Sequence, residues 1–214
     1  YIMLNSYSNI FTFNKKIINK NIKILKKGGV VGLPTETVYG LAGNANLKNS
    51  VTKIFNLKGR PKSNPLIIHY YDYNKATDDV IVNKYFRKLY KKFCPGPITF
   101  ILRRNIKSKV SPVACSNLNT VAIRFPKHKM IRAILKRINF PLAMPSANKS
   151  TKVSPVSSID VYDEFKKKIK LIIDGGKCKI GIESTVIDLT SSPKILRPGI
   201  IEKRIIEKVL KLKI

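Results

Sequence analysis

Two positively charged side chains flank a glycine in the stretch KGRPKSNP, where Lys58 and Arg60 stand on either side of Gly59. Glycine lets the backbone bend, and both cations suit phosphate oxygens, arginine as a bidentate fork and lysine as a point charge. The spacing therefore predicts two cations that reach outward to a phosphate. An exposed basic loop is the plainer interpretation of the same residues.

Ser146 and Asn148 form a second polar pair, in the stretch PSANKS. Residues two apart on an extended segment project to the same side, so both side chains can donate hydrogen bonds to phosphate oxygens without adding charge. A turn or a helix cap built from the same residues is the competing interpretation.

Arg124 and His69 each come at the end of an apolar segment, in VAIRF and PLIIH. A cation among apolar neighbours needs an anionic partner, which for Arg124 is either a substrate carboxylate or a structural salt bridge. A histidine at a strand end is more often a core or rim residue than a ligand-binding one, so we rank the ligand role of His69 second.

Several segments share one pattern, an apolar run that ends on a polar cluster containing proline or glycine. They are LPTETVYG, KGRPKSNPLIIH, MPSANKSTKVSP and GIESTVIDL. Because ligands of open α/β sheets gather at strand ends, the pattern predicts that these clusters meet in one cleft. No GxxxxGK[ST], GxGxxG, GxSxG or HExxH motif is present, which disfavours a P-loop kinase, a nicotinamide dehydrogenase and a hydrolase. A basic cleft without a dedicated nucleophile fits positioning of a nucleotide, with the chemistry between bound substrates.

The elements that must position these residues alternate between helix-like and strand-like periodicity. We expect helices at 14–29, 49–58 (capped by Asn49 or Ser50), 80–93, 129–137, 159–169 and 201–212. We expect strands at 30–33, 65–70, 98–102, 121–125, 141–144, 171–176, 184–189 and 194–197, and surface loops at 103–120 and 149–158. This alternation predicts an α/β fold with a twisted mixed sheet and flanking helices.

The 214 residues include 42 Lys and Arg against 12 Asp and Glu, a formal net charge of +30. That charge suggests a polyanion partner, such as a nucleotide, RNA or an anionic surface. Lys, Ile and Asn are frequent throughout the chain, so we favour the compositional drift of an A/T-rich genome as the main source of the charge.

Cys94, Cys115 and Cys178 are isolated, with no CxxC pair and no histidine at metal-ligand spacing. They favour a reducing, cytoplasmic setting over a zinc site or a disulfide framework. No apolar run approaches the ~20 residues of a membrane span, so we expect no membrane partner. The chain does not begin with Met, which leaves a removed targeting segment open.

A series of motifs resembles the YrdC family, the threonylcarbamoyl-AMP synthases, in the order found there. The motifs are PTETVYGLAGNA, KGRPKSNPLIIH, CPGPIT, VAIRFP, PSANKSTKVSP and GIESTVIDLT followed by ILRPG, from about Leu25 to Gly199. The resemblance implies a twisted α/β sheet with a basic concave face. It also implies one domain over 1–214, with a core at about 20–200 and a closing helix at about 201–212. By this resemblance we expect the short type, without the C-terminal domain of longer members.

The resemblance implies a reaction in which L-threonine and bicarbonate form a carbamate that attacks the α-phosphorus of ATP and releases pyrophosphate. Mg²⁺ would bind through the phosphates and reduce their charge. The product, threonylcarbamoyl-adenylate, would pass to a tRNA-threonylcarbamoyl transfer complex that modifies the adenosine beside the anticodon. The alternatives are an RNA-binding module and a carbamoyl-transfer module like that of hydrogenase-maturation proteins.

The family pattern also implies roles for particular residues. The L-threonine site would comprise Thr37, His69, Arg124, Ser184 and the main chain near Met144. The catalytic group around the phosphates would comprise Lys58, Arg60, Ser146 and Asn148, with further ATP contacts from Asn64, Thr120, Ser154 and Arg197. Met144 stands where a smaller residue is common, and GLAGNA replaces the commoner GLGANA. We therefore expect a tighter pocket and a slightly different loop.

Overall fold

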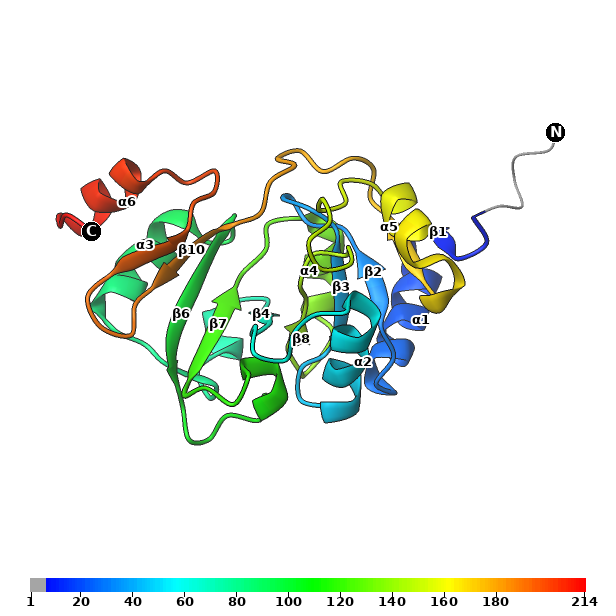
Figure 1. Cartoon of the computed structure of the whole chain (residues 1–214), viewed down its shortest axis with the longest axis horizontal. Helices are drawn as coiled ribbons and strands as arrows, with labels where there is room; N and C mark the ends of the chain where they lie inside the picture. Colours follow the sequence, from blue (N-terminus) through cyan, green and yellow to red (C-terminus); the bar gives the residue numbers. More distant parts are fainter. Residues whose placement is uncertain (1–6) are drawn as a thin grey trace.

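The computed structural model describes residues 7–214. Its strands form one 11-stranded sheet in the order β1-β9-β2-β3-β8-β4-β7-β6-β10-β11, with β5 paired to β6 (Figure 1). The strands are β1 Ile10–Thr12, β2 Val31–Leu33, β3 Gly40–Asn44, β4 Ile67–His69, β5 Val80–Ile81, β6 Ile98–Arg104, β7 Thr120–Arg124, β8 Leu142–Ala143, β9 Ile172–Asp174, β10 Thr185–Asp188 and β11 Lys194–Arg197. The α-helices are α1 Lys15–Lys26, α2 Lys48–Lys58, α3 Lys84–Phe93, α4 Lys129–Leu135, α5 Ser158–Phe165 and α6 Lys203–Leu210. Helices α1, α2 and α5 lie towards one end of the sheet, and α3 and α6 lie towards the other (Figure 1).

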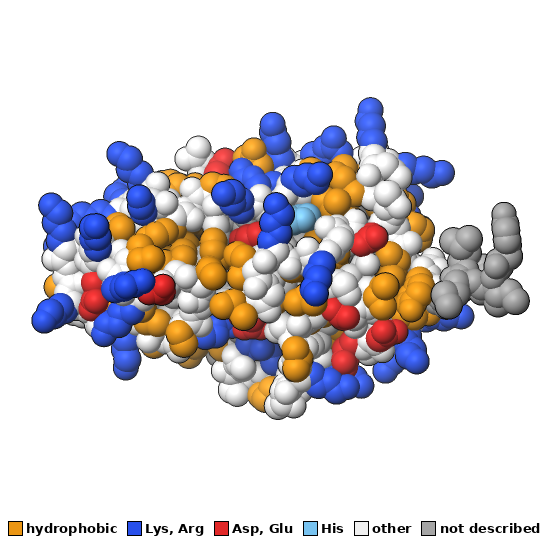
Figure 2. All heavy atoms as spheres, turned by 90° about the horizontal axis from the view of Figure 1, so that it is seen from above, with side chains coloured by type: hydrophobic (Ala, Val, Ile, Leu, Met, Phe, Trp, Pro, Cys, Tyr) orange, Lys and Arg blue, Asp and Glu red, His pale blue; other side chains and the backbone are white. Residues whose placement is uncertain are grey.

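Figure 2 shows Lys and Arg side chains spread along much of the described outline of one face, with hydrophobic and acidic side chains between them. The cations are not gathered in one patch on that face. Compositional drift as the main source of the charge stays a prediction. Within residues 7–214, no helix combines the length and the apolar character that crossing a membrane requires.

The sheet is mixed, as the sequence predicted. Strand β4 runs parallel to β7, and β6 runs parallel to β10, whereas β6–β7, β4–β8 and β3–β8 are antiparallel. Because β4 and β7 are parallel, their last residues, His69 and Arg124, are register partners. On the other side of Arg124, its partner is Thr99, near the start of antiparallel β6. The topology thereby aligns His69, Arg124 and Thr99 in one row across the sheet.

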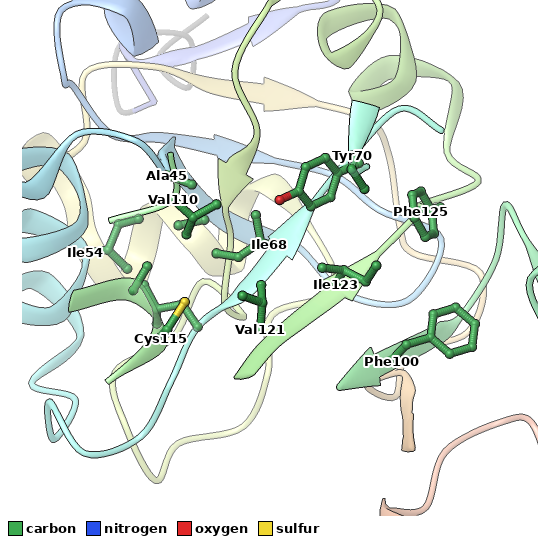
Figure 3. Packing of buried hydrophobic residues seen from close by; sticks show 14 of the residues in the cluster. Ala45, Ile54, Ile68, Tyr70, Phe100, Val110, Cys115, Val121, Ile123 and Phe125 are labelled. Carbon is green, nitrogen blue, oxygen red and sulfur yellow. The ribbon is translucent and has the colours of Figure 1, made fainter. Parts of the chain in front are cut away.

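The hydrophobic core fixes the register that produces this row. Along β7, successive side chains point to opposite faces. Val121 and Ile123 are fully buried in the main hydrophobic cluster, beside Ile68 of β4 (Figure 3). Thr120 and Arg124 lie on the other face of the strand. A slip of one residue in register would turn Arg124 towards the core and expose Val121 and Ile123. Burial of each of these two side chains contributes roughly 1.5–3 kcal/mol to the free energy of folding.

Three strands lie where the sequence predicted none, namely β1, β3 and β5. Strand β3 has the sequence GLAGN and is buried along its whole length, so it shows no alternation of apolar and polar residues. Strand β5 occupies the first positions of the helix predicted at 80–93, so the predicted start of that helix is wrong. Helix α3 begins only after Asn83, whose Oδ1 accepts a hydrogen bond from the Phe86 amide at 3.0 Å.

Two predicted helix termini also differ from the structure. The cap of α2 is Leu47, which makes no side-chain capping bond, so the predicted caps Asn49 and Ser50 are wrong and lie inside the first turn. The helix predicted at 159–169 ends earlier, at Phe165, because Lys166 adopts a φ of 46° and a short 3-10 helix, Lys166–Lys168, follows.

The closing helix α6 packs on the same core as the rest of the sheet. Its Ile206 and Leu210 belong to the main hydrophobic cluster, together with residues of β4, β6 and β7. Figure 1 shows α6 beside α3, at the end of the sheet where β10 lies. The single domain with boundaries at about 20–200 and 201–212 stays a prediction.

Candidate active site

One cavity lies at the row of strand ends. The residues predicted from sequence that line it are Arg60, His69, Arg124, Met144, Ser146, Ser184 and Arg197. The other lining residues are Thr35, Val38, Tyr39, Gly40, Ile67, Pro145 and Glu183. They come from each of the polar clusters that we expected to meet, so the structure does contain the predicted cleft.

The hydroxyls of the stretch PTET fold this segment into a tight turn at the cavity. Thr35 Oγ1 accepts hydrogen bonds from the amides of Thr37 and Val38, each at 3.1 Å, and donates to the Val38 carbonyl at 2.6 Å. Thr37 is fully buried, and its Oγ1 accepts a hydrogen bond from Arg124 Nη2 at 2.9 Å. Thr37 therefore contacts the predicted carboxylate-binding residue and does not itself line the cavity.

Arg124 already has an anionic partner within the chain. Its Nη2 lies 2.7 Å from Glu36 Oε1; the Arg124 side chain is buried and that of Glu36 is 11% exposed. Burial acts to raise the pKa of Glu36, but the charge and hydrogen bond of Arg124 outweigh it and lower that pKa below its ordinary value. Arg124 Nε has no hydrogen-bond partner among residues 7–214. The structural salt bridge that the sequence left open is thus present, and a ligand carboxylate on Arg124 stays a prediction.

His69 is a neutral hydrogen-bonding group at the cavity. Burial, together with the charge of Arg124, lowers its pKa to about 3. We assign the ring proton to Nδ1, which lies 3.2 Å from the Ile67 carbonyl oxygen, so that Nε2 is left as an acceptor. His69 can therefore accept a hydrogen bond from a ligand hydroxyl or amine at physiological pH.

Ser184 and Arg197 belong to one partly buried network. The Ser184 hydroxyl lies 2.8 Å from Thr99 Oγ1 and accepts a hydrogen bond from Arg197 Nη2 at 3.1 Å. Arg197 Nη1 pairs with Glu183, and Glu183 Oε1 accepts a hydrogen bond from Ser154 Oγ at 3.0 Å. This network connects the predicted threonine contact Ser184 to two of the predicted ATP contacts.

Arg60 is held in place by the residue predicted as a further ATP contact. Its Nε donates to the Asn64 carbonyl at 2.9 Å, and its Nη2 donates to Asn64 Oδ1 at 2.5 Å. Gly59, with a φ of 59°, ends helix α2 and turns the chain so that Arg60 lines the cavity. Asn64 thus orients the guanidinium of Arg60 but does not line the cavity.

The expectation that Lys58 reaches outward is wrong. Lys58 is 2% exposed, and its Nζ donates to the carbonyl oxygens of Ser146 and Asn148 at 2.6 and 2.5 Å. Burial, together with the charge of Arg60, lowers its pKa to about 8. The ammonium faces inward because the carbonyls of the neighbouring loop need donors. Lys58 therefore fixes the loop that carries Ser146.

Asn148 and Thr120 also lie outside the lining of the cavity. Asn148 Nδ2 donates to the carbonyls of Lys149 and Lys152, at 3.0 and 2.5 Å, so its amide stabilises its own loop. Thr120 is four residues before Arg124 on the same face of β7, a separation of roughly 13 Å along the strand. Only an elongated ligand could contact both ends of that face.

Met144 is 3% exposed and fills part of the cavity wall against Gly40. A Cβ atom at Gly40 would collide with the Met144 side chain. The Met144 side chain therefore fits at this position because Gly40 has no side chain.

The sequence interpretation assigned no site role to Glu36, Glu183 and Tyr39. Tyr39 Oη donates to the Gly176 carbonyl and accepts from the Gly175 amide, both at 2.9 Å, and so attaches the segment after β9 to the cavity wall. The two glutamates stand inside predicted ligand-binding motifs in a chain with few acidic residues. Because acidic residues are scarce in this chain, a glutamate inside such a motif could have been predicted to pair with an arginine.

Fold and site together define an α/β protein whose cavity combines three arginines, of which Arg124 is buried, with neutral hydrogen-bonding groups. Among residues 7–214, no group of three or more His, Cys, Asp and Glu side chains could hold a metal ion. Such a cavity suits a small anionic ligand. Residues 23–199 match the family model of Sua5, YciO and YrdC, described as telomere recombination. The chain therefore belongs to the Sua5/YciO/YrdC family.

Individual relatives agree with this assignment. A threonylcarbamoyl-AMP synthase of Pyrococcus abyssi is 45% identical over 191 residues, which cover 87% of this chain and 55% of the relative. A putative threonylcarbamoyl-AMP synthase of Methanocaldococcus jannaschii is 33% identical, covering 92% of this chain and 94% of the relative. The crystal structure of P. abyssi Sua5 complexed with L-threonine superposes with a TM-score of 0.90 at 40% identity, covering 94% of this chain and 60% of that one. The chain spans about half the length of the first curated relatives that it matches.

Proposed function

We propose that this chain forms L-threonylcarbamoyl-adenylate from L-threonine, bicarbonate and ATP, with release of pyrophosphate. One observation carries the proposal: groups suited to an amino acid and groups suited to phosphates line the same cavity. These groups are Arg124, His69 and Ser184 for the amino acid, and Arg60, Ser146 and Arg197 for the phosphates. The names of the relatives and the threonine complex of P. abyssi Sua5 support the same activity.

Arg124, His69 and Ser184 would recognise L-threonine. Arg124 would bind the carboxylate while it keeps its bond to Glu36. The neutral His69 Nε2 would accept a hydrogen bond from the threonine hydroxyl or amine, and the Ser184 hydroxyl lies nearby in the same cavity. Valine lacks that hydroxyl and would leave a polar group unpaired, at a cost of roughly 1–3 kcal/mol.

The phosphates of ATP would lie against Arg60, Arg197 and Ser146, with Ser154 as a further contact beside Arg197. Two arginines stabilise the charge that develops as the carbamate oxygen attacks the α-phosphorus. Lys58 and Asn148 act as positioning residues, because both hold the loop that carries Ser146. Mg²⁺ would arrive bound to ATP and neutralise part of the phosphate charge.

The proposal extends to the fate of the product and to the setting of the protein. Threonylcarbamoyl-adenylate would pass to a tRNA-threonylcarbamoyl transfer complex. The cysteines Cys94, Cys115 and Cys178 are all free thiols, which supports a reducing compartment such as the cytoplasm. Thr120, on the same face of β7 as Arg124, would contact a more distant part of the nucleotide.

Pyrophosphate release from ATP tests the proposal. We expect release only when L-threonine and bicarbonate are both present, and little with L-valine in place of threonine. Release without threonine, or none with all three substrates, would reject the synthase activity. If the chain is instead an RNA-binding module, RNA will bind with an affinity that falls steeply with salt and no pyrophosphate will form.

A further inference from the structure

The carboxylate of Glu183 lies among the groups that we assign to the ATP phosphates. It pairs with Arg197 Nη1 through Oε2 and accepts a hydrogen bond from Ser154 Oγ on Oε1, at 3.0 Å. Among the described residues that line the cavity, Glu183 is the only acidic one. An anion of the protein itself thus lies where the proposed function places an anion of the substrate.

Glu183 carries its negative charge in this setting. Burial acts to raise the pKa of Glu183, but the charge of Arg197, hydrogen bonds from neighbouring serines and the charge of Lys58 together lower it below its ordinary value. In return, the charge of Glu183 favours the protonated forms of Arg60 and Lys58, against the burial that disfavours them. Glu183 therefore neutralises part of a cationic cluster that would otherwise repel itself.

A phosphate group needs the same donors as this carboxylate. If it bound to Arg197 and Ser154 while Glu183 kept its present position, two anions would lie within a few ångströms of each other, which is strongly unfavourable in a partly buried site. Arg124 keeps an unpartnered Nε for a second anion, whereas each guanidinium nitrogen of Arg197 already has a partner, Nη1 on Glu183 and both Nε and Nη2 on Ser184. A phosphate on Arg197 would therefore have to displace Glu183. The Glu183 side chain is about one-third exposed, so it has room to turn towards solvent.

We propose that Glu183 is an internal competitor for the nucleotide phosphates. It occupies Arg197 and Ser154 when no nucleotide is bound, keeps both donors in place, and turns away when ATP enters. This inference rests on the proposed function, because it needs phosphates to bind at these donors. Glu183 then sets the affinity for ATP and takes no part in the chemical step.

Isothermal titration of Glu183→Gln tests this proposal. Glutamine keeps the size and hydrogen-bonding capacity of glutamate but loses its charge. The probes are inorganic tripolyphosphate and ATP with Mg²⁺, both without threonine. We expect both to bind about three- to tenfold more tightly to Glu183→Gln than to the wild type, since like-charge repulsion is removed.

Two other variants make the test specific. Glu202→Gln removes the same charge from an exposed pair with Arg204, at the start of α6, and should leave both affinities unchanged. Glu183→Asp keeps the charge, but its side chain is one methylene shorter, so the carboxylate lies farther from the phosphate donors. Its affinity for both probes should therefore lie between those of the wild type and Glu183→Gln. It also keeps the test decisive if Glu183→Gln fails to fold in thermal unfolding.

The outcomes separate this inference from the proposed function. If the wild type binds neither probe, the phosphate site and the internal competitor are both rejected. If the wild type binds both probes and the Glu183 variants bind no more tightly, only the internal competitor is rejected, and Glu183 serves to hold Arg197. The internal competitor is also rejected if Glu183→Gln binds Mg²⁺-ATP more weakly than the wild type but binds tripolyphosphate equally well, because Glu183 would then contact the metal ion.

Discussion

Replacing Lys58 by methionine is expected to change how the free energy of unfolding depends on pH. Lys58 is 2% exposed, and burial together with the charge of Arg60 lowers its pKa from 10.5 to about 8. Methionine fills a similar space without a charge. Since every other titratable group is common to both proteins, the difference between their unfolding free energies isolates the titration of Lys58.

The sign and size of the effect follow from linkage. Lys58 binds its proton more tightly in the unfolded chain than in the folded one, so the wild type becomes more stable as the pH rises from about 8 to 10.5. Each pKa unit corresponds to about 1.4 kcal/mol, so the full shift is worth about 3 kcal/mol. About 2.5 kcal/mol of this falls between pH 7 and pH 10. The wild type should gain that amount relative to Lys58→Met.

Urea unfolding followed by circular dichroism at several pH values from 7 to 10 measures this difference. A difference that does not vary with pH, or one that favours Lys58→Met as the pH rises, would refute the buried ammonium. Arg60→Met is a matched second variant, because it removes the neighbouring charge that lowers the pKa of Lys58. In that background, the pH at which the gain begins should move upwards.

Three further changes test other parts of the site. Arg124→Ala should abolish the binding of threonine and serine alike in isothermal titration, because their common carboxylate loses its cation; retained binding of either would leave Arg124 only its pair with Glu36. Threonine affinity should stay constant between about pH 5.5 and 8, because burial and the charge of Arg124 lower the pKa of His69 to about 3; a step near pH 6.5 that His69→Gln removes would contradict this. Gly40→Ala should lower the free energy of unfolding by about 1–3 kcal/mol, since its Cβ would collide with Met144, and Met144→Ala in the same chain should restore most of it.

The sequence by itself determined the helices, most of the strands and the polar clusters at their ends. Both ends of strand β7 lie within about one residue of the expected ends, and both ends of helix α1 lie within about three. The agreement is close because apolar periodicity and glycine or proline signals act locally. The ordered motifs also indicated the family. Strands β3 and β5 escaped prediction because a fully buried strand and a two-residue strand carry no periodic signal of their own.

Only the tertiary structure decided how the charged residues pair. Glu36 and Arg124 are 88 residues apart in the chain and meet because the turn after β2 lies against the end of β7. Lys58 turns inward because the Ser146–Asn148 loop packs on the end of α2 and offers it carbonyl oxygens. Local patterns place a charge at the end of a strand or helix, but the register of the sheet determines which opposite charge or carbonyl lies within reach. From the sequence, Lys58 and Arg124 could therefore be interpreted as side chains free to bind a ligand. In the folded chain, Lys58 is bound to backbone carbonyls and Arg124 to Glu36.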